Sequence, residues 1–70
     1  MSEQRNPQFD PRAGDVIENM FGNLVRVVSV DQFGEVTFQC PPGSSDRYCS
    51  HDTWALFMAA SEVHQLAEDS

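Results

Sequence analysis

The chain has 70 residues, eleven acidic side chains against four basic ones, and a formal net charge of −7. This length allows one small domain with a single core, and a 40% share of hydrophobic residues excludes a disordered acidic tail. Binding to a nucleic-acid backbone or to anionic lipid needs clustered Lys and Arg, so the acidic balance argues against both and leaves open a protein partner with a basic surface.

The first thirteen residues are polar and contain two prolines. They predict a flexible arm over 1–13, with any order beginning at Phe9, ahead of a domain over 14–67 and a disordered tail over 68–70. No basic start precedes an apolar run, so no secretory signal is expected. The longest apolar run, 54–60, has seven residues and is far shorter than the roughly 20 that cross a bilayer. We therefore expect a cytoplasmic protein.

Three strands are predicted in the first half of the domain, over 15–18, 24–30 and 35–40. The second is rich in β-branched residues and apolar on both faces, which favours a central strand in a folded-over sheet. The third alternates cleanly and directs one set of side chains inward, namely Val36, Phe38 and Cys40.

The two connections between these strands share one template, Asx-x-Phe-Gly, at 19–22 and 31–34. An Asn or Asp at the first position accepts hydrogen bonds from the turn, and Gly at the fourth takes a positive φ. The pattern predicts a three-stranded antiparallel meander. For Phe21 and Phe33 at the turn tips, folding back over the sheet is the favoured interpretation, and exposure as contact points is the alternative.

A loop over 40–46 precedes a short fourth strand over 47–50. Ser50, Asp52 and Thr53 are candidate helix N-caps. Two outcomes then compete: a single helix over 53–67, or a short helix through about Met58 followed by a fifth strand over 62–66.

This order of elements is the one found in small SH3-like barrels, so the predicted fold class is all-β. It would be an SH3-like antiparallel meander of about five short strands, with a short helix near the C-terminus.

The stretch 11–16, with 25–28 and 34–38, resembles the opening of such domains, including the KOW type. The chain is also similar to small uncharacterised proteins of bacteriophages and prophages, which share a Trp-x-x-Phe step and a later valine, here Trp54, Phe57 and Val63. The basic loops of nucleic-acid-binding KOW domains are replaced here by Asp31 and Glu35, so direct binding of nucleic acid is not expected.

Four side chains could serve as soft metal ligands: Cys40, Cys49, His51 and His64. No tight CxxC knuckle is present, so no metal or other cofactor is expected, and reduced cysteines are favoured over a Cys40–Cys49 disulfide. A phosphate loop, a nucleophile elbow and a paired-carboxylate signature are also missing from the sequence. No catalytic residues are predicted, and the protein is not expected to be an enzyme.

Large side chains are numerous for so small a core. Aromatic residues and Arg are the usual anchors of interfaces, and the candidates for partner binding are Arg47, Tyr48, Trp54 and Phe57, with Phe21 and Phe33 next. The predicted function is a protein-binding module of accessory or regulatory type, and a homodimer stays open. Trp54 and Phe57 could equally plug the end of a barrel.

The alternative function is an acidic nucleic-acid mimic that inhibits a host enzyme through Asp31, Glu35, Asp46 and Asp52.

Overall fold

The computed structural model describes residues 6–67. Within them the chain forms five strands and one helix. Their bounds are β1 Val16–Glu18, β2 Leu24–Val30, β3 Val36–Gln39, β4 Asp46–Cys49, α1 His51–Phe57 and β5 Glu62–Gln65. In this part of the chain, no helix combines the length and apolar character that a membrane crossing requires.

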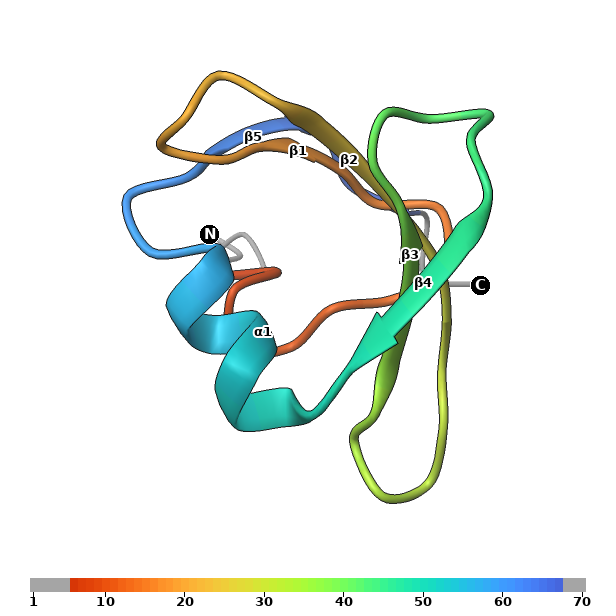
Figure 1. Cartoon of the computed structure of the whole chain (residues 1–70). Coiled ribbons are helices and arrows are strands. Elements are labelled where there is room, and N and C mark those ends of the chain that lie inside the picture. The colour runs from red at the N-terminus through yellow and green to blue at the C-terminus, as the bar shows by residue number, and fades with distance from the viewer. Residues whose placement is uncertain (1–5, 68–70) are drawn as a thin grey trace.

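All five strands belong to one antiparallel sheet with the order β4-β3-β2-β1-β5. The sheet is open, because β4 and β5 form its two edges and do not pair with each other. It curls around α1, which lies across its hollow side (Figure 1). The prediction of a small all-β domain with a short helix near the C-terminus is therefore confirmed for the kind and order of its elements.

Both predicted hairpin turns are present and use the chemistry expected of them. Asn19 Oδ1 accepts hydrogen bonds from the backbone N–H groups of Phe21 and Asn23, each at 3.0 Å. Asp31 Oδ1 accepts from Phe33 and Glu35 at 2.9 and 2.8 Å. Gly22 and Gly34 close the turns with φ of 83° and 86°. The meander was predictable because each turn is specified by its own four or five residues.

The central strand β2 contains a bulge that bends the sheet. Its register with β3 shifts between Val27 and Ser29, which leaves Val28 as the extra residue. Val25 and Val27 are buried, whereas Leu24 and Val28 are 39% and 36% exposed. The two apolar faces predicted for this strand are thus unequal, and the bulge lets Val30 rejoin the core side after the bend.

The hydrophobic core lies between the curled sheet and α1. Its buried members are Ile17, Val25, Val27, Val36, Phe38, Trp54 and Met58. The inward face predicted for β3 is confirmed, with Val36 and Phe38 buried and Cys40 packed against them.

Of the two outcomes for the C-terminal region, the single helix over 53–67 is wrong. Helix α1 has seven residues, and Ser50 is its N-cap, with the Ser50 hydroxyl accepting from Thr53 N. Ala60 has a positive φ of 57°, a left-handed conformation that turns the chain away from the helix. Strand β5 follows at Glu62–Gln65 and pairs with β1.

The segment from Asn6 to Ala13, expected as an arm, begins beside α1 and then crosses to the sheet (Figure 1). Pro7 and Pro11 are buried. Trp54 Nε1 donates to the Pro7 carbonyl at 2.9 Å, and Gln8 Nε2 donates to the Ala55 carbonyl at 2.9 Å. These bonds make the segment part of the folded unit. Residues 1–5 of the expected arm and the expected tail over 68–70 lie outside the described residues.

Asp15 joins the segment before β1 to the segment after β5. Its side chain is fully buried, and its carboxylate accepts from Arg12 N at 2.9 Å and from Ala67 N at 2.7 Å. A buried carboxylate is costly unless hydrogen bonds satisfy it, so Asp15 fixes the segments before β1 and after β5 to each other.

Candidate functional site

The candidate site is a groove between α1 and the β3–β4 side of the sheet. Three aromatic rings build its apolar base. The Phe38 ring centroid lies 5.5 Å from that of Trp54 and 5.6 Å from that of Phe57, and Trp54 and Phe57 are 6.3 Å apart. Trp54 is buried beneath the other two. The hydrogen bond from its indole to the Pro7 carbonyl holds the N-terminal segment against α1.

The groove has a volume of about 430 Å³. Its lining residues come from the β1–β2 turn, β3 and the loop that follows it, β4 and α1. They are Asn23, Phe38, Cys40, Arg47, Cys49, Thr53 and Phe57. Apolar surface with a few polar groups placed around it is the usual composition of a ligand-binding cleft.

Arg47 supplies the positive charge in the groove. It lies on the edge strand β4 directly opposite Phe38, and opposed residues of an antiparallel pair face the same side of the sheet. The Arg47 side chain therefore faces the groove that Phe38 lines. No described residue forms an ion pair or a hydrogen bond with its guanidinium, so the five donors of this group are available to a ligand.

The two cysteines line the groove at separate points. Cys49 is opposite Val36 in the β3–β4 register, and Cys40 lies four residues beyond Val36. At about 3.3 Å per residue this separates them by roughly 13 Å, whereas a disulfide requires Cα atoms within about 7 Å. The alternative of a Cys40–Cys49 disulfide is therefore wrong, and both are free thiols.

The surroundings of Cys49 favour its protonated thiol over the thiolate. Burial raises the pKa of Cys49, and the negative charge of Glu35 raises it further. The thiolate is the reactive form of cysteine, so this environment suppresses nucleophilic chemistry at Cys49.

The four metal-ligand candidates named from the sequence do not come together at one point in the fold. Within residues 6–67, no group of three ligand atoms includes Cys40, Cys49 or His51. His51 Nε2 donates instead to the Phe9 carbonyl at 3.0 Å. His64 is on β5 beside two glutamates, Glu18 and Glu62, which the sequence did not single out.

The structure separates the six residues proposed for partner binding. Arg47 and Phe57 line the groove, and Trp54 is a core residue with no exposed surface. Tyr48, opposite Thr37 on the outer face of the sheet, is 72% exposed. Phe21 and Phe33 are 73% and 83% exposed at their turn tips, so the favoured prediction that they fold back over the sheet is wrong.

The four acidic residues of the alternative function do not share one stripe. Asp31 and Glu35 belong to the β2–β3 turn. Asp46 pairs with Gln39 at the far end of β3. Asp52 is in the first turn of α1. The Asp31 carboxylate also accepts a hydrogen bond within the turn that it caps.

Sequence reasoning missed Asn23, Phe38 and Thr53 as groove residues. Phe38 was identified as a core residue, and its edge at the groove appears only once β3 is paired with β4. Asn23 carried no signal, because its place depends on the curl of the whole sheet.

No protein family matches this chain, and the comparisons with curated proteins and with solved structures also find no match.

Proposed function

We propose that this chain is a non-enzymatic protein-binding module whose ligand enters the groove between α1 and the β3–β4 strands. One observation carries the proposal. The Arg47 guanidinium lines an apolar groove and has no partner among the described residues. Arg and aromatic side chains in a concave apolar site are the typical anchors of protein interfaces. The raised pKa of Cys49, caused by its burial and by Glu35, supports a binding role over a catalytic one.

The partner we propose is a protein with a basic surface. The net charge of −7 attracts such a surface at long range. The segment that enters the groove would carry an apolar side chain for Phe38 and Phe57, and a carbonyl or carboxylate acceptor for Arg47.

We also propose that the sheet is a variant of the SH3-like barrel. The order β4-β3-β2-β1-β5, with the helix between β4 and β5, supports this relationship, although β4 and β5 leave the sheet open. The assignment to an accessory or regulatory protein of bacteriophage type rests on the resemblance in sequence.

The test compares capture of bacterial lysate proteins by the wild-type chain and by three variants. Arg47→Gln removes the charge from the groove. Thr53→Trp fills the groove while retaining the backbone N–H that Ser50 caps. Tyr48→Ala, on the opposite face, is the matched control. Circular dichroism and thermal melting establish that each variant is folded, and titration of the purified partner then gives its affinity.

We expect one protein to be captured by the wild-type chain and by Tyr48→Ala, and to lose about tenfold or more in affinity for each groove variant. Capture that is equal for all four chains would refute the groove as the binding site. Capture that disappears in high salt and depends on Asp31, Glu35, Asp46 and Asp52, but not on Arg47, would instead support the nucleic-acid mimic.

A further inference from the structure

A second group of side chains lies on the other edge of the sheet, away from the groove. Glu18 on β1 is directly opposite Glu62 on β5. The Ile17 side chain faces the core, so alternation directs the neighbouring Glu18, and with it Glu62, to the outer face. Two carboxylates in directly opposed positions of an antiparallel pair repel each other. A cation bound between the two carboxylates would remove this repulsion.

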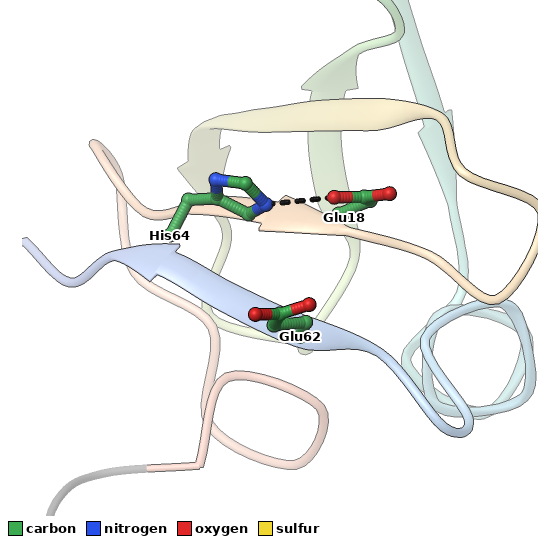
Figure 2. A group of neighbouring side chains, drawn as sticks. All are labelled: Glu18, Glu62 and His64. Atoms are coloured by element: carbon green, nitrogen blue, oxygen red, sulfur yellow. Dashed lines mark hydrogen bonds and ion pairs between the residues drawn. The ribbon is translucent and has the colours of Figure 1, made fainter.

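His64 completes the group through a β-bulge. The β1–β5 register pairs Ile17 with Val63 and Val16 with Gln65, so His64 is the extra residue on β5. Its side chain lies on the same side as the two glutamates (Figure 2), and its Nε2 donates to Glu18 Oε1 at 2.8 Å. One ligand atom from each of Glu18, Glu62 and His64 lies within 4.8 Å of the other two.

The charge of the group is not balanced by the rest of the described chain. Glu62 forms no ion pair or hydrogen bond with residues 6–67, and among these residues the Glu18 side chain makes a polar contact with His64 alone. The His64 and Glu18 side chains are 43% and 36% exposed, so water can complete the coordination of an ion held here.

We propose that Glu18, Glu62 and His64 form a binding site for a divalent transition-metal ion, with Zn²⁺ as the reference ion. One imidazole nitrogen and two carboxylate oxygens form a ligand set that suits Zn²⁺, whereas Ca²⁺ and Mg²⁺ prefer oxygen ligands alone. In the bound state Nε2 coordinates the ion and the ring proton resides on Nδ1. The hydrogen bond to Glu18 is replaced by metal–ligand bonds, which tie the edge strand β5 to β1.

The test is calorimetric titration of the full chain with ZnCl₂, compared with Glu62→Gln, His64→Asn and the control His51→Asn. We expect one ion per chain for the wild type and the control, and at least a tenfold loss of affinity in each of the other two. Zinc should also raise the melting temperature of the wild type and of His51→Asn, but not that of His64→Asn, because an ion that binds only the folded state stabilises it. Glu62 is exposed, so we expect Glu62→Gln to fold as the wild type does and its loss of binding to report on coordination.

Cobalt absorption identifies the ligands independently. Co²⁺ at the proposed site should give weak visible bands without the intense near-ultraviolet charge-transfer band of a cobalt–thiolate bond. A thiolate band would overturn the proposal in favour of Cys40 or Cys49. Equal affinity for Ca²⁺ and Zn²⁺, or zinc binding that survives both Glu62→Gln and His64→Asn, would overturn it as well.

Discussion

Cys49 illustrates how the position of one residue in the sheet decides its chemistry. The sequence places Cys49 two residues before His51, a spacing that could serve a metal or a nucleophile. In the fold, burial and the carboxylate of Glu35 both raise the pKa of the Cys49 thiol. The His51 imidazole is directed to Phe9 instead. Cys49 and His51 are therefore close in sequence, but the fold does not bring them together in one site.

We predict that Glu35→Gln speeds alkylation of Cys49. Removing the negative charge lowers the pKa of Cys49 and increases the thiolate fraction at pH 8. We expect roughly a two- to fivefold increase in rate, because a charge near the surface is partly screened. Mass spectrometry of iodoacetamide-treated protein measures Cys49 separately from Cys40. Asp46→Asn, at the other end of β4, is the control, and equal rates in both variants would contradict the assigned role of Glu35.

At the scale of elements, the hairpins and loops depend on glycines with positive φ. Gly34 has φ +86°, and an added Cβ would lie 3.2 Å from His51 Cβ. Gly43, in the β3–β4 loop, has φ +92° and no atom within 4 Å of an added Cβ. The two positions therefore differ in packing and not in backbone conformation.

We predict that Gly34→Ala destabilises the domain more than Gly43→Ala does. The strain of a positive φ costs about 1 kcal/mol in either variant. Gly34→Ala adds crowding against α1, which we expect to cost about 1 kcal/mol more. Denaturant unfolding gives the two free energies of unfolding. Equal losses would show that His51 moves aside without cost.

Elements specified by local sequence were predicted well, and those that depend on distant contacts were not. The turns at Asn19 and Asp31 required only their own residues. The short helix and β5 were one of two predicted outcomes, because the apolar run after Thr53 is compatible with either. Pairing of β5 with β1 decided between them.

The candidate sites were predicted only in part for the same reason. Arg47 and Phe57 were identified by residue type, but residue type could not show that Trp54 lies beneath them in the core. The group of Glu18, Glu62 and His64 could not be found without the β1–β5 register, since Glu62 comes 44 positions after Glu18 in the sequence.

At the scale of the whole molecule, Asp15 holds the structure together from both ends. Its carboxylate binds the backbone of Arg12 and of Ala67, and its own backbone oxygen accepts from Val27 N at 2.9 Å. One buried residue thereby links the N-terminal segment and the residues that follow β5 through its side chain, and the centre of the sheet through its backbone.

We predict that Asp15→Asn destabilises the domain by about 2–4 kcal/mol. The substitution replaces an acceptor oxygen with an NH₂ group that faces a backbone N–H, and it loses the stronger hydrogen bonds of a charged acceptor. Thermal and denaturant unfolding measure the loss. Asp52→Asn, exposed in the first turn of α1, should change stability by less than about 1 kcal/mol. A similar small effect for both would refute the linking role of Asp15.

An open sheet also has a consequence for self-association. The two free edges differ, so β4 of one copy could pair with β5 of the next, and such head-to-tail pairing builds an open filament unless the rotation between copies closes it into a ring. Both edges carry ionisable side chains, Asp46 and Arg47 on β4 and Glu62 and His64 on β5. Charges on edge strands oppose the growth of filaments. Three of these residues, Arg47, Glu62 and His64, are also those that we assign to ligand and metal binding. We therefore expect apolar substitutions at the four positions to favour polymerisation.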